Sequence, residues 1–441
     1  MGLRAWWLGV CLLSCAAAHS AVPEIPRFRV LDAADGLPNT TIPVLARDRE
    51  GYLWLATHDG LARYDGVGFR TWRHDPDDAA SLPGNIVQAL HIDGQDRIWV
   101  STENGGLSMM GADRKGFRHY RKADHPQMGS DDVFIIVSRG DTLWFGGFGG
   151  GLCRLNADGS FTHFGASETD VASLPSDDVL TLAFDGKGEL WIGTLAGLAR
   201  FDGRAVHRVP LPDDPTPMIY SITPEGDRLW IGTSAGMFER GKQGEWTTPA
   251  WSRMFARPNA VMAMVNTGDG KYWLGGQGGL WRTEGEGAPA PVSFDLQGYG
   301  ATRVLQSLLQ QPDGGMWVPV PSRGLGYLQS DWRRIATLSP AEGLGPGLHR
   351  GIAPASAGGL WLTSSKGAIE HLDTVSGEVT VLPWHAEALK DERLTSVLED
   401  RHGRLWVGHS GGLLRIDLAT RAMQRWLADS EKDAVPSTGP V

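Results

Sequence analysis

The residue types that most often do chemistry are present in this 441-residue chain, but they do not stand at catalytic spacings. The thirteen histidines are scattered, without the intervals of metal ligands. No HExxH, GxSxG, Walker or CxxC motif occurs anywhere along the sequence. We therefore expect no catalytic residue, no metal site and no cofactor in this chain.

The N-terminal segment "MGLRAWWLGVCLLSCAAAHSAVPEIP" decides which cysteines remain in the exported protein. Arg4 precedes an apolar run, and small residues surround a cleavage point at Ser20 or Ala21, a pattern typical of a secretory signal peptide over residues 1–21. Lipoprotein cleavage at "LLSC" is the alternative. Because two of the three cysteines lie in this segment, Cys153 is left without a disulfide partner. Export without disulfides indicates a bacterial periplasm.

The charge balance excludes several classes of partner. A formal net charge of −10 gives no basic surface for nucleic acid or for an anionic membrane. No apolar run of membrane-spanning length follows the N-terminal segment. Membrane attachment is therefore expected only through a segment downstream of this chain.

The elements that must hold any binding site belong to a repeated unit. In one copy the short apolar segments "IVQALHI", "RIWVST", "LSMM" and "FRHY" are separated by Gly, Asp and Asn turns, which indicates four strands. Nine copies recur 39 to 47 residues apart, anchored at Trp54, Trp99, Trp144, Trp191, Trp230, Trp273, Trp317, Trp361 and Trp406. Four-stranded units at this period predict the blades of a β-propeller. We expect each tryptophan to pack between neighbouring blades.

A second copy of the opening sequence divides the repeats. "RFRVLDAADGLP" begins at Arg27, and the similar "DWRRIATLSPAEGLG" begins at Asp331. We predict an all-β chain, with a seven-bladed β-propeller of four-stranded blades over 26–330 and an incomplete second propeller over 331–441. Phe28–Leu31 would pair with the seventh repeat as its outermost strand, which closes the ring. Trp332–Ile335 would play the same part in the second ring.

The last residues, "ADSEKDAVPSTGPV", resemble the start of a repeat. Pro38, Pro83 and Pro175 each precede a repeat tryptophan by 16 residues, so Pro436 places the next one near residue 452, beyond Val441. The second propeller is thus expected to contain two full repeats and the start of a third.

The strings "DREGYLWLATHDGLARYDG" and "DGKGELWIGTLAGLARFDG", together with the "DGLP" opening, resemble the two-component-regulator propeller family over almost the whole chain. The repeats at Trp317 and Trp361 depart from this pattern. The resemblance implies the exported sensor region of a membrane signalling protein, typically with two seven-bladed propellers and a cytoplasmic histidine kinase or diguanylate cyclase. Any such output, and a homodimer, would belong to a longer parent protein.

Propellers bind ligands where loops of several blades meet at the channel mouth. Candidate ligand-binding residues in interblade loops and inner hairpins are Asn39, His58, Asn85, Glu103, Asp132, Phe148, Asp178, Gln277, Arg303 and Arg323. Asn and Asp also form turns, which is the alternative interpretation of these positions. Their variation between copies is the feature that favours binding.

The sequence therefore predicts a non-catalytic, periplasmic, ligand-sensing module for a small molecule, with a saccharide as one candidate class. Two alternatives stay open. One is a secreted propeller enzyme, a polysaccharide lyase or glycosidase, and the other is a structural or protein-binding propeller.

Overall fold

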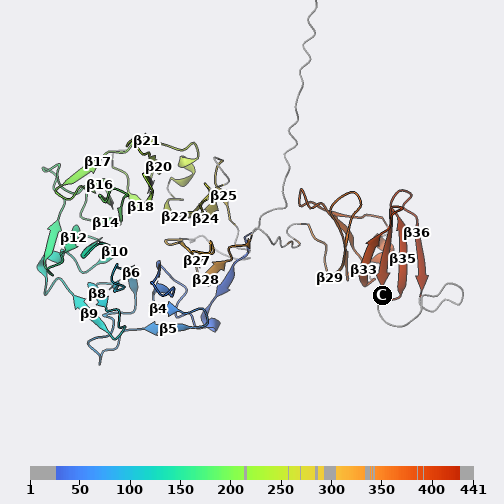
Figure 1. The fold of residues 1–441 in the computed structure, drawn as a ribbon, viewed down its shortest axis with the longest axis horizontal. Helices are drawn as coiled ribbons and strands as arrows, with labels where there is room; N and C mark the ends of the chain where they lie inside the picture. The colour runs from blue at the N-terminus through green and yellow to red at the C-terminus, as the bar shows by residue number, and fades with distance from the viewer. Residues whose placement is uncertain are drawn as a thin grey trace, which may run out of the picture. The chain divides into compact units, whose positions relative to one another are not determined.

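The computed structural model describes residues 26–427, except 213–215, 257, 269, 284–286, 293–303, 333–337, 339, 341–342, 385 and 391. The predicted signal peptide (1–21) and the expected start of a tenth repeat (428–441) lie outside the described residues. The described part consists mainly of antiparallel strands in four-stranded sheets, which confirms the predicted all-β class. In Figure 1 the sheets of residues 26–332 surround a central axis, as blades do in a propeller.

Two compact units divide the chain between Trp332 and Arg333. In the first unit six sheets are each made of four consecutive strands. The first three of these sheets comprise β2 (Val44–Arg47), β3 (Leu53–Thr57), β4 (Gly60–Tyr64) and β5 (Phe69–Trp72); β6 (Val87–Ile92), β7 (Ile98–Thr102), β8 (Leu107–Met110) and β9 (Phe117–Tyr120); and β10 (Val133–Arg139), β11 (Thr142–Gly147), β12 (Leu152–Leu155) and β13 (Phe161–Phe164). The next three comprise β14 (Val179–Phe184), β15 (Leu190–Thr194), β16 (Gly197–Phe201) and β17 (Val206–Val209); β18 (Ile219–Glu225), β19 (Arg228–Thr233), β20 (Gly236–Arg240) and β21 (Trp246–Thr247); and β22 (Val261–Asn266), β23 (Tyr272–Gly276), β24 (Gly279–Arg282) and β25 (Ala290–Pro291).

A further sheet of the first unit joins the two ends of that unit. It comprises β1 (Arg29–Leu31), β28 (Gly324–Leu328), β27 (Met316–Val320) and β26 (Leu309–Gln310), in this spatial order. β1 pairs antiparallel with β28, and Leu31 lies opposite Leu325. The prediction that the N-terminal strand is the outermost strand of the seventh repeat is confirmed. Backbone hydrogen bonds therefore hold together residues almost 300 positions apart.

The second unit contains two described sheets and one short α-helix. The sheets comprise β29 (His349–Pro354), β30 (Leu360–Ser364), β31 (Ile369–Leu372) and β32 (Val379–Val381), followed by β33 (Leu394–Glu399), β34 (Arg404–His409), β35 (Gly412–Asp417) and β36 (Met423–Leu427). The helix α1 (Ala386–Leu389) lies between the sheets in sequence, while the 3-10 turns of the first unit are η1 (Ala33–Asp35), η2 (Pro126–Met128) and η3 (Ser252–Phe255).

Eight of the nine repeat tryptophans belong to apolar clusters between sheets, as predicted, whereas Trp406 of the last described sheet is only partly buried. Trp99, on β7, is 2% exposed and belongs to one apolar cluster with Val133 and Ile136 of the following sheet. The Leu-Pro turns add a second contact of this kind, because Leu82 packs beside Trp54 of the preceding sheet. The apolar core is therefore a series of layers between adjacent blades.

One carboxylate holds the turn between the first two strands of several blades, which reads DREGYLW up to Trp54 and DGQDRIW up to Trp99. Asp93 Oδ1 accepts hydrogen bonds from the N–H groups of Gln95 and Arg97 at 2.9 and 3.0 Å. Its Oδ2 accepts from the indole N–H of Trp99 at 2.7 Å. Burial opposes ionisation, but these hydrogen bonds lower the pKa of Asp93 below its ordinary value. The indole bond recurs at Asp48, Asp185 and Asp400.

The two divergent repeats keep their strands but change this bond. Gln311 stands six residues before Trp317, where four other repeats have Asp, and the Trp317 indole N–H is buried without a partner among the described residues. Trp361 instead donates to Glu399 of the following sheet at 2.7 Å. The blade geometry therefore survives loss of the consensus acid.

Trp332 differs from expectation. Its ring lies edge-on to Trp273 at 6.0 Å between ring centroids, and the Arg282 guanidinium lies 4.8 Å from its centroid. Trp332 therefore packs on the first unit and does not begin an outer strand of the second, because an apolar contact with Trp273 is available directly after β28. The rest of that predicted strand, 333–335, lies outside the described residues.

Candidate functional site

The interblade loops and inner hairpins meet at one end of the first unit through a repeated backbone hydrogen bond. In five hairpins of the first unit, the first residue of the turn donates its N–H to a carbonyl of the loop that enters the same blade. This bond joins His58 to Thr41, Glu103 to Ile86, Leu195 to Asp178, Ser234 to Met218 and Gln277 to Ala260.

The same loops also bond to the preceding blade. Gly60 donates its N–H to the Asn85 carbonyl, and Gly106 donates to the Asp131 carbonyl. Backbone bonds thus connect hairpin, loop and next hairpin around the channel mouth. Because the backbone makes these bonds, the side chains at the mouth are free to differ between blades.

Three of the predicted ligand-binding residues serve the loops themselves. Asn39 Oδ1 accepts the N–H of Thr41 at 2.8 Å, and Asn85 Oδ1 accepts the N–H of His74 at 2.8 Å. Asp178 Oδ1 accepts the N–H of Gly149 in the neighbouring hairpin at 2.8 Å. These contacts agree with the turn-forming alternative.

Glu103 and Asp132 form an acidic pair at the mouth, on neighbouring blades. Burial, and then the negative charge of Glu103, raise the pKa of Asp132 above its ordinary value. Asp132 Oδ1 is buried and has no hydrogen-bond partner among the described residues. This carboxylate oxygen is a buried acceptor without a donor, and the exposed Glu103 is the acid of the pair that a ligand hydroxyl or ammonium group can reach.

An aromatic pair adjoins the acidic pair. The ring of Phe148, 42% exposed in the hairpin between β11 and β12, lies edge-on to Phe134 with centroids 4.8 Å apart. Gly147, next to Phe148, packs so closely on Asp132 that an added Cβ would lie 1.7 Å from the Asp132 carbonyl oxygen. The aromatic and acidic side chains therefore share one region of the mouth.

Phe134 was not among the sequence candidates. It occupies a bulge, because the register of β10 on β11 shifts between Val133 and Ile135. The same shift occurs at the start of β6, β14, β18 and β22. A bulge turns its extra residue out of the regular alternation. The sequence did carry a signal for this bulge. Phe134 directly follows Val133, the first residue of the strand, and so interrupts the alternation of inward and outward side chains.

The remaining candidates are not brought together by the described contacts. His58 and Gln277 lie in equivalent hairpins of separate blades, and the backbone N–H of each donates to the interblade loop of its own blade. Arg323 lies in the hairpin between β27 and β28, with its N–H bonded to the Val320 carbonyl. Arg303 lies outside the described residues.

The single cysteine of the described part is not exposed for chemistry. Cys153 is buried, and its thiol donates to the Met128 carbonyl at 2.8 Å. Burial raises its pKa to about 12. Among the described residues no group of three or more His, Cys, Asp or Glu could hold a metal ion.

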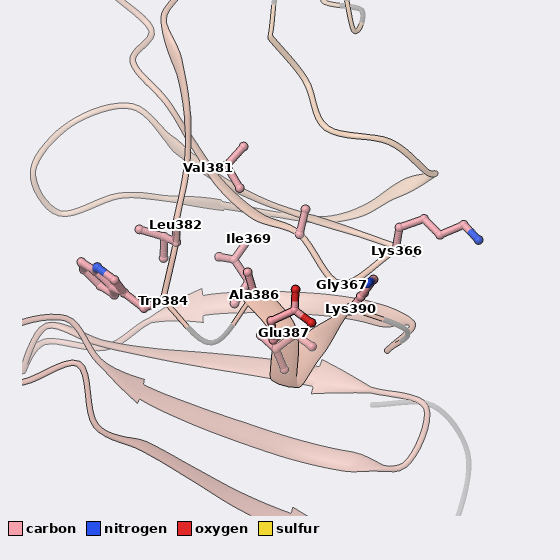
Figure 2. Close-up of a pocket in the computed structure, with 11 residues that line it drawn as sticks. Lys366, Gly367, Ile369, Val381, Leu382, Trp384, Ala386, Glu387 and Lys390 are labelled. Carbon is pink, nitrogen blue, oxygen red and sulfur yellow. The ribbon is translucent and has the colours of Figure 1, made fainter.

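A separate cavity of about 240 Å³ lies in the second unit, beside α1 (Figure 2). Ile369, Leu382 and Leu389 give it an apolar lining, and Trp384 closes one side. Lys366 projects away from it in Figure 2. No repeated sequence position marks this cavity, which sequence reasoning missed.

Comparison with known proteins supports the repeat assignment. The model of the two component regulator propeller matches residues 36–59, 81–104 and 173–196. Each match runs from a Leu-Pro loop to the inner hairpin of one blade. Histidine kinase P4 of Formosa agariphila is 35% identical over 54 residues, which are 12% of this chain and 4% of that protein.

Solved structures show the same fold. The extracellular domain of a putative hybrid two component system from B. thetaiotaomicron has a TM-score of 0.66 and 20% identity, over 90% of this chain and 60% of that one. A second such domain has a TM-score of 0.56 and 17% identity, over 91% and 53%. A streptogramin B lyase has a TM-score of 0.51 and 17% identity, over 69% and 96%.

The chain thus spans just over half the length of the two extracellular domains. Among the described residues no helix is long and apolar enough to cross a membrane. The β-propeller class and the predicted family resemblance are confirmed.

Proposed function

From a chain that carries two-component-regulator propeller repeats, we propose an extracytoplasmic sensor module that binds a small solute at the mouth of its first propeller. The chain itself performs no catalysis. Its conformational response passes to a histidine kinase or diguanylate cyclase output on a longer protein. In this proposal the signal peptide exports the module, which works in the periplasm.

The observation that carries the proposal is the contrast between backbone and side chains at the mouth. Repeated backbone bonds hold five of the hairpins, and the Asp178 carboxylate holds Gly149 in the Phe148 hairpin, so this part of the mouth is preorganised before a ligand arrives. At one place on it, the exposed acid Glu103 lies near Asp132 and the exposed ring of Phe148. Hydroxyl-rich solutes, saccharides included, fit such a combination of acceptors and an aromatic surface.

The extracellular domains of the two hybrid two component systems support an extracytoplasmic role for this chain as well. Their likeness at or below 20% identity establishes fold alone, so the role is inferred and not transferred.

The test is a thermal-shift screen of the full chain with neutral saccharides, organic acids and amines. Hits are then titrated against the variants Phe148→Ala and Glu103→Gln. We expect each substitution to weaken binding about tenfold or more, because each removes a direct contact. Glu50→Gln is the control, since Glu50 is an exposed acid in a turn at the opposite end of its blade.

Two outcomes would count against the proposal. A hit whose affinity is unchanged in both mouth variants binds elsewhere. A screen in which no solute stabilises the chain removes the support for sensing.

A further inference from the structure

An aromatic ring stands at one fixed point on the outermost strand of the first three sheets. In the first sheet this residue is Trp72, which is paired with Leu61 and stacks on Trp54 with ring centroids 5.0 Å apart. It packs on the same apolar cluster as Leu82, a residue of the loop that leads to the next sheet. The rings at the same point of the next two sheets are Tyr120 and Phe164. A ring therefore fills the space between hairpin and loop.

The first sheet of the second unit has a leucine at this point. In the register of its sheet, Ile369 occupies the position that Leu61 has in the first sheet. The N–H of Leu382 donates to the Ile369 carbonyl at 2.9 Å, which places Leu382 where the first sheet has Trp72. A leucine side chain fills less volume than an indole, so the exchange leaves space beside the hairpin.

The cavity of about 240 Å³ beside α1 lies in this space (Figure 2). Ile369 and Leu382 line it, together with Leu389. Leu389 is buried and precedes β33 by the interval that separates Leu82 from β6, so the two leucines are counterparts. The residues that flank the Trp72 ring thus have counterparts around the cavity, and the ring itself is missing.

A sheet without this ring is not hollow for that reason alone. The fourth sheet has Val209 opposite Leu198. Leu211, two residues further along the chain, is 5% exposed and belongs to one apolar cluster with Leu198. In the second unit the residue two positions after Leu382 is Trp384, which is half-buried and lines the cavity. This loop therefore forms a wall of the cavity and does not fill it.

Contacts outside the cavity hold its walls in place. Arg425 on β36 donates to the Ala388 carbonyl of α1 at 3.2 Å. Gly367, in the hairpin before Ile369, packs so closely on α1 that an added Cβ would lie 1.7 Å from the Leu389 carbonyl oxygen. The cavity is therefore formed before a ligand arrives, which lowers the cost of binding.

We propose that this cavity binds a small aromatic molecule, whose ring takes the place that the Trp72 ring has in the first sheet. An apolar cavity of about 150 Å³ is large enough for benzene, so 240 Å³ admits one substituted ring. Trp384 offers that ring an aromatic contact. The charged residues of the lining have both signs and set no charge for the ligand: Lys366, Glu387 and Lys390. The site is separate from the mouth of the first propeller.

The test is the binding of phenol to the full chain, measured by isothermal titration calorimetry and by saturation-transfer NMR. We expect saturable binding with a dissociation constant of about 1 mM or lower. Cyclohexanol has the same number of heavy atoms but no aromatic ring. It should bind several-fold more weakly, because it cannot make the ring contact with Trp384.

Two variants fill the cavity from the chain itself. Leu382→Trp supplies the ring that the first sheet has, and should lower the affinity for phenol at least about tenfold and raise the melting temperature. Ala386→Leu fills the cavity from α1 and should lower the affinity by a similar factor. The matched control is Ala388→Leu, because Ala388 is exposed on the same helix and is not part of the lining. Circular dichroism should be unchanged in all three variants.

Four results would overturn the proposal. One is the absence of saturable phenol binding, and another is an affinity that stays the same in both cavity-filling variants. A loss of binding in Phe148→Ala but not in Ala386→Leu would place the phenol at the mouth of the first propeller. Equal affinities for cyclohexanol and phenol would contradict the aromatic class of ligand.

Discussion

Acid should destabilise the first unit through one buried histidine. His91 lies on β6, and its Nε2 is 2.7 Å from the Ser138 hydroxyl of the following sheet. Burial lowers the pKa of His91 from 6.5 to about 4, and the nearby Asp93 carboxylate opposes part of that shift. The folded chain thus holds this imidazole neutral at a pH where the unfolded chain protonates it.

The size of the effect follows from the pKa difference. A shift of one pKa unit corresponds to about 1.4 kcal/mol, so the lowered value of His91 amounts to about 3 kcal/mol of unfolding free energy. This stabilisation is complete above pH 6.5 and disappears as the pH falls toward about 4, because the unfolded state binds the proton more readily over that interval.

The assay is urea unfolding followed by tryptophan fluorescence, at about pH 7.5 and about pH 4.5. Between these conditions the wild type should lose about 2 to 3 kcal/mol more than His91→Gln, whose amide still reaches Ser138 but does not titrate. His58→Gln, at an exposed hairpin, controls for replacing histidine by glutamine. Equal losses in the wild type and His91→Gln would refute the burial argument.

Three other substitutions or reactions test the packing. Asp185→Ala removes the acceptor of the Trp191 indole N–H and of two turn N–H groups, and should cost about 2 kcal/mol in chemical denaturation; a neutral result would contradict the role of the turn. Gly60→Ala should lower the melting temperature more than Gly66→Ala. Both glycines have a positive φ, but only at Gly60 would an added Cβ lie 2.4 Å from a backbone oxygen. Equal losses in the two variants would show that the positive φ accounts for the whole effect and the close contact for none of it. Cys153 should resist thiol reagents until the chain unfolds, and rapid labelling of the native chain at neutral pH would disprove its burial.

The candidate site could be predicted only in part. The hairpins and interblade loops were located correctly, and the variation of their side chains indicated where a ligand could bind. Whether Asn85 or Asp178 is free to bind depends on a hydrogen bond to another loop, which repeat spacing does not reveal. Phe134 reaches the mouth through a register shift in its strand, and a period-two pattern cannot place such a residue.

The sequence by itself determined the strands, their grouping in fours and the burial of the repeat tryptophans. Alternation and turn residues act within a few positions, so each repeat carries that information locally. The closure by β1 was also readable, because the second opening sequence at Asp331 marked where a ring begins. Only the tertiary structure decided which side chains meet across blades, such as His91 with Ser138 or Asp132 with Glu103. Those partners are tens of residues apart, and their contact depends on how one twisted sheet packs on the next.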